Sequence, residues 1–368
     1  MKNLFDKSNI NGMTLKNRFL RSSVGEDLAD ENGHITDELF HVYEELAQGG
    51  VGTIFTGFTR IEKDEVPSPG MTAIYDDSFI SEYKKLTDMV HEYNSNIVMQ
   101  IVYGGSQTRS AHLSSKIWGP SAVKNESSGI IPTEMTKADI DYLIKSHAKA
   151  AVRAKKSGFD GVEIHAAHGY LLSQFLCPHF NNRTDEYGGN IENRARIILE
   201  IYNEIRKEVG ANFPVFIKIN SEDFMEDGLT SEESIIVCKM LAEAKIDAIE
   251  VSGGNLSSPS VLSNNLGCIR TKIAASKEKE SYFREHAARL ANEVSVPIIL
   301  TGGNRHIEVI EDILQNTNIS YFGLARPLMC EPNLINIWAD ENKKAPKCVS
   351  CNKCFGNPGK RCIFNLRK

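Results

Sequence analysis

Three side chains that can carry protons follow one short apolar segment. Residues 161–164 come directly after a Gly-Phe-Asp turn, and their apolar character predicts a buried strand. His165, His168 and Tyr170 follow in quick succession. Two imidazole N–H groups could converge on one carbonyl oxygen and stabilise an enolate as an oxyanion hole does, while Tyr170 protonates the neighbouring carbon. Such a set suits the reduction of a conjugated alkene.

The same residues have two other interpretations. An isolated His-x-x-His is often a pair of hydrogen-bonded structural histidines beside a core tyrosine, because buried polar groups find partners. A metal pair is also open, since His is the commonest metal ligand. However, no third ligand is obvious nearby, and the spacing differs from the i, i+4 pair of zinc proteases.

Two further polar residues lie inside predicted strands. Gln100 interrupts the apolar segment 97–102, and Lys218 interrupts the segment 214–220. Lysine is almost never fully buried without a partner. Lys218 therefore faces either a bound ligand or a carboxylate of a neighbouring strand, such as Glu163 or Glu250, and Gln100 needs partners for its amide.

The wider stretch resembles a known family. His-Ala-Ala-His-Gly-Tyr-Leu at 165–171, followed by Asn-Arg-Thr-Asp-Glu-Tyr-Gly-Gly-Asn-Ile-Glu-Asn-Arg at 182–194, resembles the signature of the Old Yellow Enzyme family. It is most similar to the bacterial members that carry His-His rather than His-Asn. The resemblance implies a (β/α)8 TIM barrel that binds FMN, takes NAD(P)H as reductant and reduces the C=C bond of a small α,β-unsaturated carbonyl compound, an enone or enal.

The resemblance also implies flavin contacts. Ser22 and Val24 end the first predicted strand, 19–24, and Gln100 would hydrogen-bond the flavin ring. Lys218 would place a cation at the N1/C2=O edge of the ring, where relatives usually carry Arg, and Lys keeps the charge without the bidentate fork. Gly57 ends the strand 51–57, where it permits close approach of a flat ligand or simply marks a bend.

The residues after two predicted strands predict a phosphate site, because one segment is rich in glycine and the other carries an arginine. The strands 297–300 and 319–323 would be the seventh and eighth, and barrels commonly bind phosphate with the loops that follow these strands. We expect Gly302, Gly303, Ala325 and Arg326 to hold the FMN phosphate. Because no Gly-x-Gly-x-x-Gly follows a strand, NAD(P)H should use the same flavin face as the second substrate.

The remaining elements suit a single barrel. Asn11-Gly12 predicts a turn in a hairpin that plugs the barrel, and Thr136 resembles the start of a capping box. The long connection 104–135 would line the substrate pocket, and the long connection 257–279, with Arg270, is a candidate for substrate choice. The expected domains are a barrel over 1–340 and a Cys-rich tail over 341–368, and the expected helices span 37–48, 78–93, 136–156, 190–208, 230–244 and 281–294.

Four of the eight cysteines are concentrated in the tail. Cys348, Cys351, Cys354 and Cys362 are separated by two, two and seven residues, a spacing that favours a metal site over disulfides in a reducing compartment. Relatives that resemble 2,4-dienoyl-CoA reductase hold a [4Fe–4S] cluster there, with longer gaps. Zinc and a metal-free remnant remain open. An electron-relay protein and a flavin amine dehydrogenase are therefore the alternative functions.

Composition excludes few functions but sets the compartment. The chain has 368 residues, of which 41% are hydrophobic, and a formal net charge of −6, so neither a nucleic acid nor an anionic membrane is expected as partner. No apolar stretch is long enough for a transmembrane helix, and the start lacks a signal-peptide core. We expect a cytoplasmic homo-oligomer.

Overall fold

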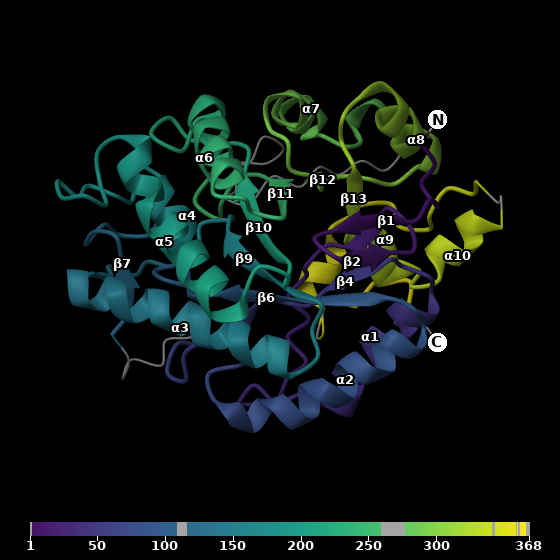
Figure 1. Ribbon diagram of the computed structural model, residues 1–368, viewed down its shortest axis with the longest axis horizontal. Coiled ribbons are helices and arrows are strands. Elements are labelled where there is room, and N and C mark those ends of the chain that lie inside the picture. Colours follow the sequence, from purple (N-terminus) through teal and green to yellow (C-terminus); the bar gives the residue numbers. More distant parts are fainter. Residues whose placement is uncertain are drawn as a thin grey trace.

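Eight parallel strands close into a barrel in the computed structural model (Figure 1). The structure describes residues 2–108, 116–258, 277–340, 343–357, 359 and 361–365. The strands pair in the order β4-β3-β13-β12-β11-β10-β9-β6, and a β4–β6 pairing closes the circle. The predicted (β/α)8 class is confirmed. The barrel strands are β3 (Phe19–Arg21), β4 (Thr53–Phe55), β6 (Asn96–Val102), β9 (Gly161–Ala166), β10 (Val215–Asn220), β11 (Ala248–Ser252), β12 (Ile298–Leu300) and β13 (Tyr321–Leu324).

Helices surround the strands, as Figure 1 shows. Thr136 forms the predicted capping box with Asp139 and starts α3, which fits the preference of helix N-termini for reciprocal side-chain caps. The sequence did not predict α8, nor the short helices α4, α9 and α10. The helices are α1 (Asp37–Gln48), α2 (Ile80–Glu92), α3 (Lys137–Lys156), α4 (Leu171–Leu176), α5 (Ile191–Val209), α6 (Ser231–Glu243), α7 (Arg284–Glu293), α8 (Ile307–Asn316), α9 (Arg326–Cys330) and α10 (Leu334–Ala339).

A small hairpin closes one end of the barrel. β1 (Ser8–Ile10) and β2 (Met13–Leu15) are antiparallel, and both turn residues, Asn11 and Gly12, have positive φ. This is the backbone that Asn-Gly turns favour. Ile10, Met13 and Leu15 pack in one cluster with inward residues of the barrel, including Phe55 and Phe216. The predicted plug is therefore present, and it fills the interior below the site.

The structure describes most of the long connection 104–135 but little of the connection 257–279. The first contains the short strands β7 (Trp118–Gly119) and β8 (Thr133–Glu134), which pair with each other. Most of the second, with Arg270, lies outside the described residues. A two-residue strand, β5 (Thr59–Arg60), adds to β6.

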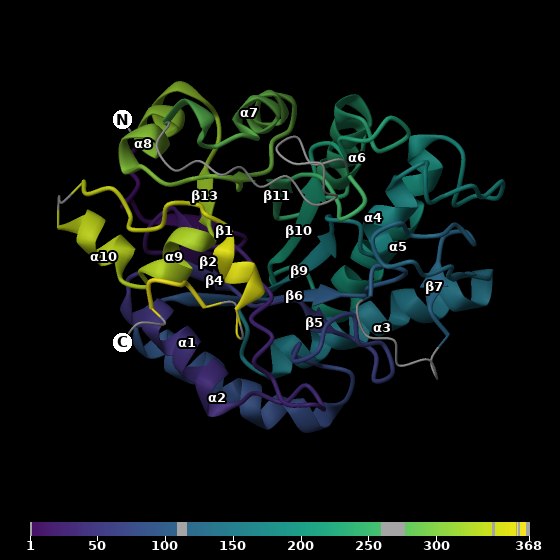
Figure 2. The same cartoon turned by 180° about the vertical axis from the view of Figure 1, so that it is seen from behind.

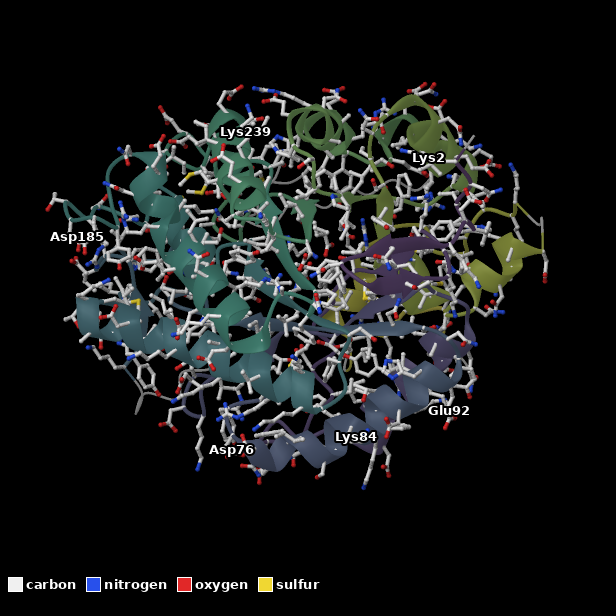
Figure 3. All side chains as sticks on the ribbon, viewed as in Figure 1. Lys2, Asp76, Lys84, Glu92, Asp185 and Lys239 are labelled. Atoms are coloured by element: carbon white, nitrogen blue, oxygen red, sulfur yellow. The ribbon has the colours of Figure 1, made fainter. Side chains whose placement is uncertain are left out.

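The surface and the tail complete the fold. Charged side chains such as Lys84, Asp185 and Lys239 lie at the periphery of the molecule (Figure 3). Figure 2 shows the C-terminal segment alongside α9, and Arg361 forms an ion pair with Glu38 of α1. Among the described helices, none combines the length and apolarity needed to cross a bilayer.

Candidate active site

One large cavity opens where the barrel strands end. Its volume is about 210 Å³, counted as the space open to the centres of water molecules. This is more than ten times the roughly 10–15 Å³ that a single water needs on the same measure. Ligand sites of barrels lie at this end of the strands. Of the predicted site residues, the cavity is lined by Ser22, Val24, Gln100, His165, His168, Tyr170, Lys218, Gly302, Gly303, Ala325 and Arg326.

Gly57 is not among the residues that line the cavity. A Cβ placed at Gly57 would lie 2.0 Å from Glu26 Oε2 and 2.9 Å from the carbonyl oxygen of Val24. The absence of a side chain therefore permits close packing of β4's end against the segment after β3. The flavin contact expected for Gly57 has no support in this arrangement.

His165 is a buried imidazole with a defined hydrogen-bonding pattern. It points inward from β9, and its Nδ1 accepts the N–H of Ala167 at 3.3 Å. In a neutral ring the proton then resides on Nε2. Burial, aided by the nearby Lys218 cation, lowers the pKa of His165 to about 3. His165 is thus a neutral donor at physiological pH rather than a cation.

His168 and Tyr170 lie beside His165. His168 adopts a left-handed backbone, with φ of 62°, which is uncommon for a residue with a side chain. Asn220 Oδ1 accepts its N–H at 3.1 Å, and its ring Nε2 lies 2.7 Å from Ser252 Oγ. The His165 ring centroid is 5.3 Å from that of His168 and 4.9 Å from that of Tyr170. The three side chains therefore share one side of the cavity.

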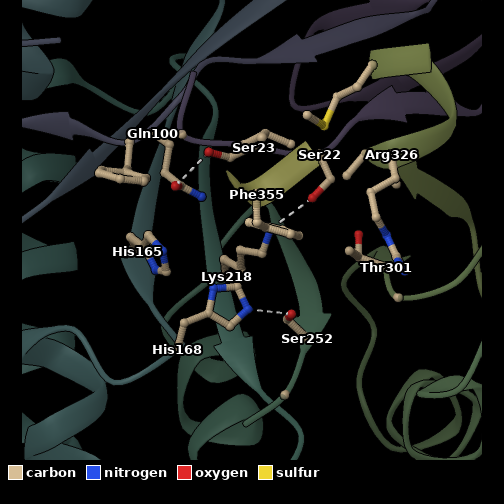
Figure 4. A pocket seen from close by; sticks show the side chains of 18 of the residues that line it. Ser22, Ser23, Gln100, His165, His168, Lys218, Ser252, Thr301, Arg326 and Phe355 are labelled. Atoms are coloured by element: carbon tan, nitrogen blue, oxygen red, sulfur yellow. Dashed lines mark hydrogen bonds between the residues drawn. The ribbon is translucent and has the colours of Figure 1, made fainter. Parts of the chain in front are cut away.

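Lys218 and Gln100 are both held by neighbouring side chains. Lys218 Nζ lies 2.9 Å from Glu250 Oε1 and donates to Ser22 Oγ at 2.8 Å. Gln100 Oε1 accepts from Ser23 Oγ at 2.8 Å. In Figure 4, Gln100 and His165 lie on one side of Lys218, and Thr301 and Arg326 lie on the other. Lys218 thus has the carboxylate partner considered above, and it also faces the cavity.

The opposite end of the cavity can accept an anion. Gly302 and Gly303 have positive φ, and Arg326 Nη1 donates to Asn352 Oδ1 at 2.6 Å. Arg305 is nearly completely buried. Its Nη1 lies 3.6 Å from the buried Glu280 Oε1 in an ion pair, and its Nε has no hydrogen-bond partner among the described residues. A buried guanidinium that keeps an unused N–H donor in a cavity wall suits a phosphate group. Arg305 was not predicted from the sequence, although a cation directly after Gly-Gly-Asn is a usable signal.

Other residues of the cavity were missed for a different reason. The aromatic side chains Phe58, Tyr282, Phe283 and Phe355 line it from loops and from the tail. Ser252, the partner of His168, is the last residue of β11. Loop residues carry no periodic pattern, so nothing in the sequence marks which of them face the site.

The four predicted cysteines line a second, smaller pocket. Cys348 and Cys362 pack with a fifth cysteine, Cys330, and burial raises the pKa of the Cys348 and Cys354 thiols. In the described part of the chain, no group of three or more His, Cys, Asp or Glu is placed to hold a metal ion. The donor set suits a soft metal, but the side chains do not stand as a formed site, so the metal site stays a prediction.

Comparison with known proteins identifies the family. Residues 3–344 match the NADH:flavin oxidoreductase / NADH oxidase family. The chain belongs to this family. The resemblance to Old Yellow Enzyme is likewise confirmed. An Old Yellow Enzyme homologue from Zymomonas mobilis has the same fold with a TM-score of 0.79 at 20% identity, over 95% of each chain.

Two curated relatives are larger than this chain. It is 32% identical to an NADH oxidase of Thermoanaerobacter brockii over 99% of its own length and 55% of the relative's. It is also 32% identical to a cinnamate reductase of Clostridium sporogenes, over 96% of its length and 56% of the relative's. The chain thus spans about half the length of these relatives.

The tautomer and charge of His165 give a first prediction. Because its pKa is lowered to about 3, the ring should stay neutral, with the proton on Nε2, from pH 5 to pH 9. Long-range 1H–15N NMR of the imidazoles measures both properties. His91 is an internal control, because its hydrogen bond to Asp160 raises its pKa, so its ring should carry a charge at pH 5, where that of His165 is neutral. A His165 ring that becomes charged near pH 6.5 would contradict the assignment.

Proposed function

We propose that this chain is an FMN-dependent oxidoreductase that uses NAD(P)H to reduce the activated C=C bond of α,β-unsaturated carbonyl compounds. The observation that carries the proposal is the pair of neighbouring imidazoles, one of them a buried neutral N–H donor, beside Tyr170 in the large cavity. A relay of electrons would need no proton donor there.

The cavity residues fit FMN on an observation independent of the family. Arg305, whose Nη1 is ion-paired with Glu280, places an Nε without a hydrogen-bond partner among the described residues in the cavity wall. It follows the glycine turn at 302–303, where backbone groups leave room for an anion. Arg305 and Arg326 would hold the phosphate, and Lys218, Gln100 and Ser22 would hold the ring. When bound, FMN supplies the hydride that it has taken from the nicotinamide.

The protein side chains would then act on the carbonyl substrate. The Nε2–H of His165, together with His168, would donate hydrogen bonds to the carbonyl oxygen and stabilise the negative charge that develops on it. Tyr170 would give its phenolic proton to the carbon next to the carbonyl. Because Ser252 lies at 2.7 Å from the His168 ring, it would fix that ring's orientation.

The double substitution His165→Ala and His168→Ala tests this role. Removal of one oxyanion donor typically costs about 10²- to 10³-fold in rate, so turnover of an enone should fall by at least that factor. Bound flavin and oxidation of NAD(P)H by oxygen should persist, because neither needs the histidine pair. Unchanged enone turnover would rule out the role.

The same kinetic experiment reports how the two substrates share the site. NAD(P)H and the enone would occupy the cavity in turn, which gives parallel lines in double-reciprocal plots. Intersecting lines would show a ternary complex and contradict the shared site. An anaerobic visible spectrum of the purified protein comes first, because a protein without flavin bands would remove the proposal itself.

Arg305 gives a prediction about flavin binding alone. Hydrogen bonds to charged groups contribute roughly 1.5–3 kcal/mol, so Arg305→Ala should weaken FMN binding by about ten- to hundredfold. Riboflavin, which lacks the phosphate, should bind wild type and variant alike. Fluorescence titration of the flavin-free protein measures both, and Arg305→Lys, which keeps the charge, should lie between. An equal loss for riboflavin would mean that Arg305 acts on the fold rather than on the phosphate.

The cysteine pocket supports a second candidate, in which the tail holds an iron–sulfur cluster or zinc and relays electrons. The favouring observation is that Cys348, Cys351, Cys354 and Cys362 line one pocket. Metal quantification after anaerobic purification should then find about four irons per chain or one zinc. Cys351→Ala with Cys354→Ala should abolish binding, whereas Cys330→Ala, outside the predicted ligands, should not. A metal-free wild type would leave the tail without this role.

A further inference from the structure

Two glutamates are buried inside the barrel next to the predicted flavin contacts. Glu163 of β9 and Glu250 of β11 lie on the two strands that flank β10, which carries Lys218. Neither glutamate is exposed to solvent. Isolated carboxylates are rarely buried without compensation, so their partners decide what charge this part of the barrel carries.

The hydrogen bonds leave one oxygen of each glutamate without a donor. Glu250 Oε1 accepts from Ser22 Oγ at 2.5 Å and Thr301 Oγ1 at 2.6 Å, and it pairs with Lys218 Nζ at 2.9 Å. Glu163 Oε2 accepts from Gln100 Nε2 at 2.6 Å. Glu163 Oε1 and Glu250 Oε2 have no donor among the described residues when both groups are carboxylates.

A single proton shared by Glu163 and Glu250 would supply the missing hydrogen-bond donor. The two side chains are within hydrogen-bonding reach of each other, and burial together with the Glu250 charge raises the pKa of Glu163. The Lys218 cation and the hydrogen bonds from Glu163, Ser22 and Thr301 lower the pKa of Glu250 despite its burial. Two adjacent carboxyl groups in a dry site share one proton rather than ionise together. A protonated Glu163 supplies the donor that both orphaned oxygens lack.

We propose that Glu163 and Glu250 are positioning residues that hold one shared proton and thereby set the charge beside the flavin ring. With the proton on Glu163, the Glu250 carboxylate balances the Lys218 cation, so the three side chains together are neutral. The group also fixes Gln100, whose amide is held between Glu163 and Ser23. The inference rests on the proposed binding of FMN at this cavity, and it adds residues that do not line the cavity themselves.

The charge balance predicts that, of two matched variants, only one shifts the reduction potential of the bound flavin strongly. Glu250→Gln removes the carboxylate that is paired with Lys218 Nζ at 2.9 Å, so the cation loses its nearest anion, which favours the anionic reduced ring. The reduction equilibrium of the bound flavin should shift by at least tenfold, which is about 30 mV for a two-electron couple, and sulfite should bind more tightly. Glu163→Gln replaces a neutral acid by a neutral amide, so the potential should stay within about a third of that shift. Equal shifts in both variants would overturn the shared proton.

A second measurement does not depend on flavin. Infrared difference spectra between wild type and Glu163→Gln, recorded on flavin-free protein at neutral pH, should show the C=O stretch of one protonated carboxylic acid in the wild type only. If that band is absent, the inference fails even when the protein binds FMN. If the band is present but the purified protein takes up no flavin, the proposed function fails and the proton pair stands.

Discussion

The ion pair between Lys218 and Glu250 is the interaction on which the site depends. An ammonium group buried in a barrel is costly unless a well-placed anion and further hydrogen bonds compensate for the lost water. The register of β10 and β11 places these residues side by side, and Ser22 and Thr301 join them from two other strand ends. A slip by one residue would turn Lys218 out of the barrel. The need to pair the Lys218 cation with Glu250 therefore favours one register of β10 and β11 at the candidate site.

The polar side chains around Lys218 and Glu250 lie above an apolar cluster that closes the other end of the barrel. Ile10, Met13 and Leu15 of the hairpin pack against inward side chains near the other ends of the strands. The barrel thus separates two tasks along its axis. One end buries apolar surface, which supplies stability, and the other concentrates polar groups around the Lys218–Glu250 ion pair. Because the apolar cluster excludes water from below, electrostatic interactions among the polar groups above are strengthened.

The sequence predicts much of this arrangement, and its failures have identifiable causes. Strands and capped helices are predictable because burial and capping leave periodic patterns, as at Thr136. Which glutamate pairs with Lys218 was not predictable, since Glu163 and Glu250 both lie inward on strands that flank β10 and only the register selects. Arg305 and the aromatic residues of the loops were missed because loops carry no such pattern. Gly57 was predicted to allow close approach of a flat ligand or to mark a bend, yet its lack of a side chain serves packing against Glu26.

The tail shows why a boundary in sequence need not divide a site. Arg326, Met329 and Ser350 line both the large cavity and the cysteine pocket, and Phe355 lines the large cavity from the tail. Arg326 also donates to Asn352, between two of the cysteines in sequence. The cysteine pocket and the predicted phosphate end of the cavity therefore share part of one wall. The predicted division at residue 340 separates compositions, whereas the wall of the cavity is built from residues on both sides of it.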